Sequence, residues 1–378
     1  MVRIRKFSRK LFIISNGTAC FFFLLACCNA FLHPGRWWII SLLGLIFPYL
    51  FLIVLGHFVF GLFFRSCRVW SFLSLAVLLI GWTNIHIFLA FHRDGGVTTE
   101  RPPHSLRVLT WNVRSWDEFI TRKGGASGHR AKMMEFIDQQ QPDILCLQEF
   151  FESHNPKEFP PNIPYIRDRL HFPYYFFSRD YHRYDGVYEE GVIIFSRYPI
   201  VDTALQHFSR SGGLRATESL ISADIDVNGQ KVRIYTTHLQ SVLFHSKEYH
   251  DLEIIRNVDD SIFQASRSII KKLRDAYRSR GDQAEQVRAQ LDLTPYPSVI
   301  CGDFNDVPNS YTYSTIRGKW QDAYISKGFG IGRTYVHLSP TLRIDYIMAT
   351  PSLPVLRCSK FALPYSDHHP VEADLQLP

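Results

Sequence analysis

The sequence predicts an apolar helical membrane region followed by an α/β domain built on two sheets. Three long apolar stretches fill residues 1–95, whereas residues 105–378 alternate short β-rich runs with helical segments. With 46% hydrophobic and 15% aromatic residues, the chain has ample material for a packed core, which excludes intrinsic disorder. Residues 96–104, which contain Gly96 and Pro102-Pro103, have the composition of a linker between the two parts.

The apolar stretches, at residues 11–32, 37–64 and 69–91, each reach the roughly 20 residues that a helix needs to cross a bilayer. None contains an acid or an internal Lys or Arg, so a transporter's charged ion pathway is not expected. Basic residues number five before the first stretch, one in the first loop and two in the second. The positive-inside rule therefore predicts a cytoplasmic N-terminus and a domain exported across the inner or plasma membrane. The alternative is a cleaved signal peptide at the first stretch.

The net charge of +7 comes from this membrane region. Residues 1–95 hold nine of the 42 Lys and Arg residues but one of the 35 acids. The remainder keeps 33 basic and 34 acidic residues, a net charge of −1. The basic excess is therefore no sign of nucleic-acid binding by the C-terminal domain.

Most strand runs of the C-terminal domain end in a polar residue with metal-binding or acid–base chemistry. These residues are Asn112, Glu149, His238, Asp303, Asn305, Asp345, Asp367 and His368. Strands that emerge at one edge of a sandwich bring such side chains together, and loops at a scaffold's edge usually carry catalytic groups. Taken singly, each has an ordinary interpretation, such as a turn-capping Asn or a structural His. Asp345 is the exception, because a carboxylate within an apolar run needs a partner.

The residue types at these strand ends suit metal-assisted hydrolysis of a phosphoester. A phosphodiester is anionic and repels nucleophiles, so a divalent cation is needed to neutralise the developing charge. Mg²⁺ prefers carboxylate and amide oxygens, whereas a zinc site would use more His or Cys. Such oxygens are offered by Asn112, Glu149, Asp303 and Asp367. A His–Asp pair supplies acid–base chemistry near neutral pH, and direct attack by water is expected because no Ser, Cys or Lys takes a nucleophile's place.

Six motifs, in order, give the C-terminal domain a resemblance to the endonuclease/exonuclease/phosphatase family. They are TWNV, LQEF, FSRYPI, TTHLQS, GDFND with the following Pro308, and RIDYI ahead of SDHHP. The resemblance covers about residues 105–378. It implies a four-layer α/β sandwich, with two mixed sheets face to face and helices outside. It also implies a Mg²⁺- or Mn²⁺-dependent hydrolase related to DNase I-like nucleases, inositol-phosphate phosphatases and bacterial sphingomyelinases.

The resemblance implies three metal-site residues. Glu149 resembles the principal metal ligand, Asn112 lies beside it, and Asp367 is similar to an additional metal-site acid. Some nucleases of the family carry an acid two residues after the Asn of the first strand. This chain has Arg114 there and so departs from their pattern.

Five further residues match catalytic positions of the family. Asp303 and Asn305 resemble the pair that positions the attacking water and holds the phosphate. His238 resembles a ligand of the scissile phosphate that assists the leaving group. His368 is similar to the catalytic histidine, with Asp345 fixing its tautomer. Abasic-site enzymes have a tyrosine in place of His238, so abasic-site repair is not expected.

These inferences together predict a membrane-anchored, metal-dependent phosphoesterase that acts on a small phosphodiester or a lipid headgroup. Its near-neutral domain argues against extensive contact with nucleic-acid phosphates. A non-specific exported endonuclease or exonuclease is the alternative. A non-catalytic scaffold on the same fold is an alternative of another class, which the intact acids and histidines at all six motifs disfavour. The expected partners are the lipid bilayer and the phosphoester substrate, and no obligate protein partner is evident.

Overall fold

The structure is a computed structural model that describes residues 2–92, 101–119, 128–209, 215–242 and 262–377. The chain divides into two compact units. The first comprises Met1–Leu89, Val242–Gly281 and Val307–Thr315, and the second comprises Ala90–Ser241, Asp282–Asp306 and Ile316–Pro378. The first unit thus contains most of the predicted membrane region and two later segments of the chain. Residues 96–100 of the predicted linker lie outside the described residues.

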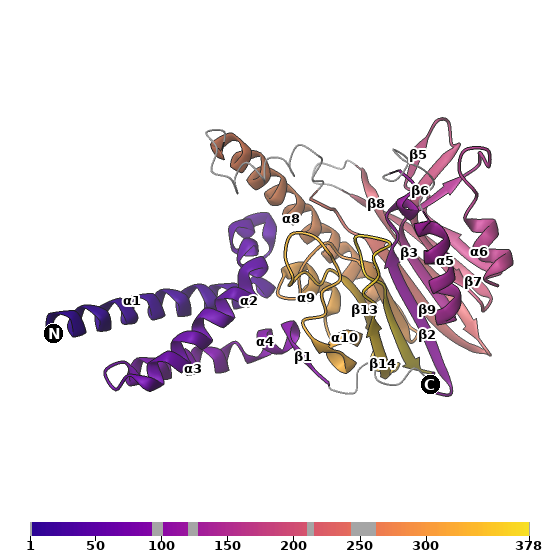
Figure 1. Cartoon of the computed structure of the whole chain (residues 1–378). Helices are drawn as coiled ribbons and strands as arrows, with labels where there is room; N and C mark the ends of the chain where they lie inside the picture. The colour runs from indigo at the N-terminus through magenta and orange to yellow at the C-terminus, as the bar shows by residue number, and fades with distance from the viewer. Residues whose placement is uncertain (1, 93–100, 120–127, 210–214, 243–261, 378) are drawn as a thin grey trace. The chain divides into compact units, whose positions relative to one another are not determined.

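Apolar helices make up most of the first unit (Figure 1). In chain order they are α1 (Val2–Cys27), the 3-10 helix η1 (Cys28–Phe31), α2 (Pro34–Phe63), α3 (Arg68–Ile80) and α4 (Trp82–Phe88). Two stretches, Lys6–Phe31 and Pro34–Phe63, are long and apolar enough to span a membrane. These two candidate spans correspond to the first two predicted ones.

The third predicted span, at residues 69–91, is not a single helix. Helices α3 and α4 meet at an angle of 62°, and Gly81 between them has non-helical backbone angles. A Cβ at Gly81 would lie 2.4 Å from the ring of Phe23, so the close packing of α1 against this bend requires glycine. Hydropathy alone missed the bend because it measures composition and not helix continuity. The prediction of three spans is therefore corrected to two, or three only if the bent pair crosses as one.

Buried amides and hydroxyls link the segments of the first unit. Asn16 on α1 accepts a hydrogen bond of 2.7 Å from the hydroxyl of Ser74 on α3. Asn309 accepts a bond of 2.8 Å at its carbonyl from Asn29 and one of 3.2 Å at its side chain from Asn84. Such bonds between helices are one way in which polar side chains stabilise helix association within a membrane.

Two mixed β-sheets form the framework of the second unit (Figure 1). The seven-stranded sheet has the order β14-β15-β2-β3-β6-β4, with β5 paired to β6. Its strands are β2 (Ser105–Asn112), β3 (Ile144–Ser153), β4 (Tyr174–Phe177), β5 (Tyr181–Arg183), β6 (Tyr188–Ser196), β14 (Val355–Lys360) and β15 (Val371–Gln376). The pair β2–β3 is parallel, and the other neighbours are antiparallel.

The six-stranded sheet has the order β11-β13-β10-β9-β8-β7. Its strands are β7 (Ile200–Ser209), β8 (Arg215–Val227), β9 (Gln230–His238), β10 (Ser298–Asp303), β11 (Gln321–Asp322) and β13 (Asp345–Ala349). Here β9 and β10 are the parallel pair. The short strands β1 (Ala90–Phe91) and β12 (Phe329–Gly330) form a separate antiparallel ribbon.

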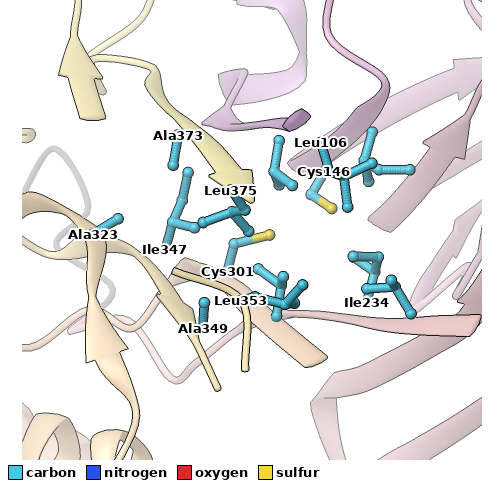
Figure 2. Close-up of a cluster of buried hydrophobic side chains, with 14 of the residues drawn as sticks. Leu106, Cys146, Ile234, Cys301, Ala323, Ile347, Ala349, Leu353, Ala373 and Leu375 are labelled. Carbon is cyan, nitrogen blue, oxygen red and sulfur yellow. The ribbon is translucent and has the colours of Figure 1, made fainter. Parts of the chain in front are cut away.

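The main core of this unit lies between the two sheets. Leu106 and Cys146 from the seven-stranded sheet pack with Ile234, Cys301 and Ile347 from the six-stranded sheet (Figure 2). Strands buried on both faces are expected to be continuously apolar, as residues 144–147 are. The core therefore fixes the position of one sheet against the other. It thereby also fixes the strand ends that carry the candidate site.

Helices cover the outer faces of the two sheets. Helices α5 (His129–Gln140) and α6 (Ile163–Arg169) pack on the seven-stranded sheet through a second core that includes Trp111 and Phe136. The end of α8 (Ile262–Asp292) contacts β9, where the hydroxyl of Tyr235 donates to the carbonyl of Gln290. The described residues also form the helices η2 (Arg114–Asp117), α9 (Tyr311–Arg317) and α10 (Ala323–Lys327). This arrangement confirms the predicted four-layer α/β sandwich.

Candidate active site

Ends of four strands from both sheets meet at one edge of the sandwich. Strand β2 ends at Asn112, β9 ends at His238 and β10 ends at Asp303, whereas β13 begins at Asp345. Asp303 lies opposite His238 in the parallel pair and opposite Asp345 in the antiparallel pair. The sheet register therefore places these side chains side by side, although they are far apart in the sequence.

Glu149 reaches the site through an irregularity inside β3. The register of β3 with β6 shifts between Leu147 and Phe150, and Glu149 has a positive φ of 49°. A bulge of this kind redirects a side chain that would otherwise follow the regular alternation of the strand. The carboxylate of Glu149 accepts a hydrogen bond of 3.0 Å from the amide of Asn112, so the redirected residue joins the strand-end cluster.

The close approach of β10 to β9 requires the glycine that precedes Asp303. Gly302 has a φ of 138°, and a Cβ there would lie 2.1 Å from the carbonyl oxygen of Thr237. A larger residue would separate the two strands at the point where they present Asp303 and His238. The glycine of the GDFND motif thus sets the geometry of the site.

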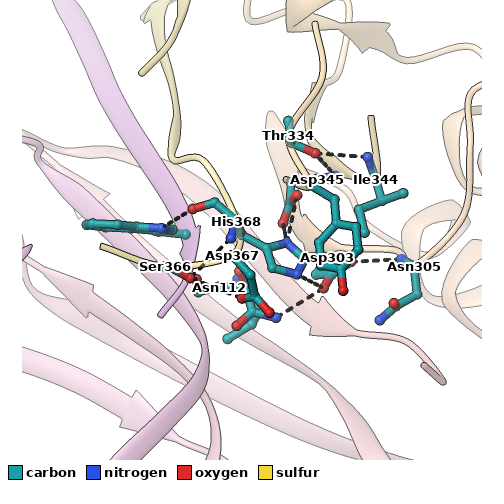
Figure 3. Close-up of polar contacts among 12 residues, drawn as sticks. Asn112, Asp303, Asn305, Thr334, Ile344, Asp345, Ser366, Asp367 and His368 are labelled. Atoms are coloured by element: carbon teal, nitrogen blue, oxygen red, sulfur yellow. Dashed lines mark hydrogen bonds and ion pairs between the residues drawn. The ribbon is translucent and has the colours of Figure 1, made fainter. Parts of the chain in front are cut away.

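The carboxylate of Asp303 is the centre of the cluster (Figure 3). Its Oδ2 accepts a hydrogen bond of 3.1 Å from Asn112 and lies 3.6 Å from the Nε2 atoms of both His238 and His368. Its Oδ1 accepts a bond of 2.9 Å from the backbone N–H of Asn305. The side chain is 1% exposed, and this burial raises the pKa of Asp303 while the two histidines partly offset the rise.

His368 and Asp345 form a buried pair beside this carboxylate (Figure 3). Nδ1 of His368 lies 3.0 and 3.1 Å from the two carboxylate oxygens of Asp345. The backbone N–H of Asp345 donates to the hydroxyl of Thr334 at 3.1 Å, which helps to fix that residue. Burial alone would lower the pKa of His368, but Asp345 and Asp303 outweigh it and raise the pKa to about 10. The imidazole is therefore protonated near neutral pH.

Most of the residues predicted from the sequence come together here, namely Asn112, Glu149, His238, Asp303, Asp345 and His368. Asn305 adjoins the cluster through its backbone, but its side-chain amide donates to the carbonyl of Leu239 at 3.0 Å. Asp367 is directed to Arg114, whose Nε lies 3.4 Å from its Oδ2. Asp367 is not among the three residues whose ligand atoms cluster, and its role as a metal ligand stays a prediction.

Supporting residues that were not singled out from the sequence hold the cluster in place. Nε1 of Trp111 donates to the carbonyl of His368 at 2.9 Å, and the hydroxyl of Ser366 donates to the carbonyl of Asn112 at 2.8 Å. Trp111 belongs to the TWNV motif and Ser366 to the SDHHP motif, so the sequence contained evidence for both. Thr334 lies outside every motif, so its contact with Asp345 had no sequence signal.

The donor set fits a divalent cation. Asp303, Asp345 and His368 offer ligand atoms that all lie within 4.8 Å of one another, and all three residues are buried. The side chain of Glu149 is 32% exposed, so the cluster is accessible from solvent. The buried carboxylates of Asp303 and Asp345 need a compensating positive charge, and the protonated His368, which cannot coordinate a cation in that state, supplies part of it. Carboxylate oxygens suit Mg²⁺ or Mn²⁺, whereas Asn112 presents its amide nitrogen to Glu149 and Asp303 and its oxygen to the backbone N–H of Arg114.

Comparison with known proteins adds two family matches. The sequence model of the endonuclease/exonuclease/phosphatase family matches residues 109–368, well over half of the chain. A model described as a domain of unknown function (DUF8431) matches residues 9–88. No curated protein matches the chain.

Several solved structures share the fold of the second unit. An endonuclease/exonuclease/phosphatase from Beutenbergia cavernae is 21% identical with a TM-score of 0.50, covering 74% of this chain and 72% of its own. The human Nocturnin catalytic domain with bound sulfate is 18% identical with a TM-score of 0.50, covering 74% and 97%. A family protein from Leptotrichia buccalis is 17% identical with a TM-score of 0.50, covering 72% and 100%. At such identities the likeness shows the fold alone.

Proposed function

Because the chain belongs to the endonuclease/exonuclease/phosphatase family and is thus a hydrolase of phosphoester bonds, we propose that its strand-end site cleaves a phosphodiester or phosphomonoester by metal-assisted attack of water. The observation that carries the proposal is the position of Asp303. Its buried Oδ2 lies 3.6 Å from Nε2 of two histidines and accepts a hydrogen bond from Asn112. One carboxylate is thereby placed among groups that can donate to phosphate oxygens.

The proposed reaction is a single displacement at phosphorus. The oxygen of water bonds to phosphorus, the bond from phosphorus to the leaving oxygen breaks, and the water proton passes to Asp303. Burial raises the pKa of Asp303, which makes it a stronger base than an exposed Asp. His238, which is 20% exposed, is placed to donate a proton to the leaving oxygen. His368, protonated near neutral pH, donates to a phosphate oxygen and stabilises its developing charge.

The residues that would hold the cation are Glu149 and Asn112, the latter with its amide turned so that the oxygen replaces the nitrogen that now faces Glu149. Bound there, Mg²⁺ or Mn²⁺ would neutralise the charge that develops on the phosphate. The amide nitrogen of Asn112 donates to both Glu149 and Asp303 and so holds the two carboxylates close to each other. These bonds leave the remaining carboxylate oxygen of the one-third exposed Glu149 available to solvent or a ligand.

We propose that the enzyme is anchored in a membrane and acts on a small phosphodiester or a lipid headgroup. Two N-terminal helices are long and apolar enough to span a bilayer, which supports the anchor. The remainder of the chain has a net charge of −1, which disfavours a substrate that must be held by many phosphate contacts. The distribution of basic residues around the apolar stretches supports a cytoplasmic N-terminus, and an exported domain then requires that the bent pair α3 and α4 crosses the membrane as a third span.

A substrate panel tests this proposal. The full-length protein in detergent is assayed with Mg²⁺ or with excess EDTA against bis(p-nitrophenyl) phosphate, a phospholipid, RNA and duplex DNA. We expect metal-dependent turnover that falls by orders of magnitude in Glu149→Gln. Glu135→Gln, an equivalent change on the exposed side of α5, serves as the matched control and should retain full activity. Unchanged turnover in EDTA, or in Glu149→Gln, would reject the proposal.

A further inference from the structure

A pocket of about 630 Å³ opens in the second unit beside the His368 site. Its walls include Arg114, Asp117, His129, Leu363, Tyr365 and Asp367. Asp367 directly precedes His368 in the chain, so the pocket adjoins the position proposed for the reacting phosphate. Pockets of 300–1,000 Å³ are typical of small-molecule sites. This one is large enough for the organic group of a phosphoester.

One wall of the pocket alternates hydrogen-bond donors with acceptors. Nε of Arg114 lies 3.4 Å from Oδ2 of Asp367, and its Nη1 lies 4.0 Å from Oδ1 of Asp117. Nδ1 of His129 lies 2.7 Å from the other carboxylate oxygen of Asp117. The side chains of Arg114 and His129 are 35% and 34% exposed, so both remain accessible to a ligand. One guanidinium lies between two carboxylates, which leaves this wall without an excess of positive charge.

An apolar wall contains Ala362, Leu363 and Pro364, followed by the ring of Tyr365. The rest of the lining consists of Val336, His337, Ser366 and His369. The ring centroid of Tyr365 lies 5.8 Å from that of His129, so the apolar wall meets the polar wall at this pair. A ligand that fills the pocket must therefore present a hydrogen-bonding edge to one side and C–H groups to the other.

The two walls together discriminate among classes of ligand. A hydroxyl group both donates and accepts, so several hydroxyls on one ring can bond alternately to carboxylates and to a guanidinium. An alkyl chain would cover the 35% exposed guanidinium of Arg114 without offering it a hydrogen bond. A second anionic group would meet the carboxylates of Asp117 and Asp367 together with the single guanidinium.

We propose that this pocket binds a sugar or another polyol carried by the substrate, with the hydroxyls on the wall of Arg114 and Asp117 and the C–H face on Tyr365. This inference rests on the proposed function, because it takes the adjacent site to hold the phosphate. In this proposal the segment η2, which follows Asn112, selects the organic group of the substrate.

Two phosphonates matched in carbon number test the inference, since water does not break their C–P bonds. The dissociation constants of hexose 6-phosphonate and n-hexylphosphonate are measured by calorimetry on the full-length protein in detergent with Mg²⁺. We expect the hexose ligand to bind at least about tenfold more tightly, the equivalent of one net hydrogen bond. Arg114→Met should reduce this preference to less than threefold. Arg167→Met, which removes an exposed ion pair with Asp168, is the matched control and should keep it.

His129→Asn provides a second variant should Arg114→Met fail to fold, and it should also weaken the preference for the hexose ligand. Equal affinities, tighter binding of the alkyl ligand, tighter binding of a thymidine 5′-phosphonate, or no binding at all would overturn the inference. Hydrolysis of bis(p-nitrophenyl) phosphate, measured in parallel, separates the two proposals. Turnover without a hexose preference rejects the polyol pocket alone, whereas a hexose preference without turnover rejects the proposed catalytic function alone.

Discussion

Replacing Asp345 by Asn removes the negative charge beside His368 with little change in shape. Both residues are buried, and Nδ1 of the imidazole lies 3.0 and 3.1 Å from the carboxylate oxygens. A hydrogen bond to a charged group contributes about 1.5–3 kcal/mol, which corresponds to a loss of roughly 10- to 150-fold in kcat. Without this carboxylate the pKa of His368 should fall from about 10, so activity should decline at a lower pH than in the wild type.

A double-mutant cycle shows whether the two residues act as a unit. Removing a donor that stabilises the developing charge costs about 10²- to 10³-fold, so His368→Ala should lose that much. The double variant should then lose no more than about threefold beyond His368→Ala. The assay is kcat of the full-length protein on bis(p-nitrophenyl) phosphate with Mg²⁺ between pH 6 and 10.

Asp322→Asn is the matched control. Asp322 is also a buried carboxylate paired with a cation, Arg343, at 2.8 Å, but it belongs to the start of α10. Its replacement should lower stability and leave the pH profile of kcat unchanged. Fully additive losses in the Asp345 and His368 variants would refute the reasoning, because they would show that Asp345 does not act through the imidazole.

Three further predictions concern stability, nucleic acid and topology. Burial raises the pKa of Glu152 to about 7, above its unfolded value of about 4.3, so its contribution to stability is complete below pH ~4.3 and is lost as the pH rises through 7. Glu152→Gln should therefore flatten the fall in melting temperature between pH 5 and 8, and an unchanged slope would contradict this. The inactive Glu149→Gln protein should bind duplex DNA with a dissociation constant above about 1 μM at physiological salt. A sub-micromolar dissociation constant, with a salt dependence of the affinity that implies six or more phosphate contacts, would indicate a nuclease. Alkaline phosphatase fused after Arg101 should be active in a bacterial host, and an inactive fusion would mean that α3 and α4 do not cross as one span.

The strand-end residues of the site were predictable because their signal is local. Asn112, His238 and Asp303 each end an apolar run, and the sheet register then brings the ends together. The position of Glu149 within the LQEF motif was also predictable, but the bulge that redirects its side chain was not. A bulge depends on the pairing of β3 with β6, which residue types along one strand do not encode.

The ion pair between Arg114 and Asp367 could not be predicted from the residues alone. It depends on η2, where four consecutive residues other than glycine, at positions 114–117, have φ values between 48° and 60°. Such residues avoid this region of backbone space unless tertiary packing holds them there. The buried Trp116 of η2 packs against Phe150 with ring centroids 5.7 Å apart, a contact that supplies part of that packing.

Hydrolysis in ¹⁸O-labelled water tests the central claim most directly. The full-length protein, with Mg²⁺ and one equivalent of bis(p-nitrophenyl) phosphate, is followed through a single turnover, and the product phosphate ester is analysed by mass spectrometry. Direct attack of water at phosphorus predicts one ¹⁸O atom in that product, formed by the wild type and abolished or slowed by orders of magnitude in Asp303→Asn. Product without the label, or formed at the wild-type rate by Asp303→Asn, would contradict the account.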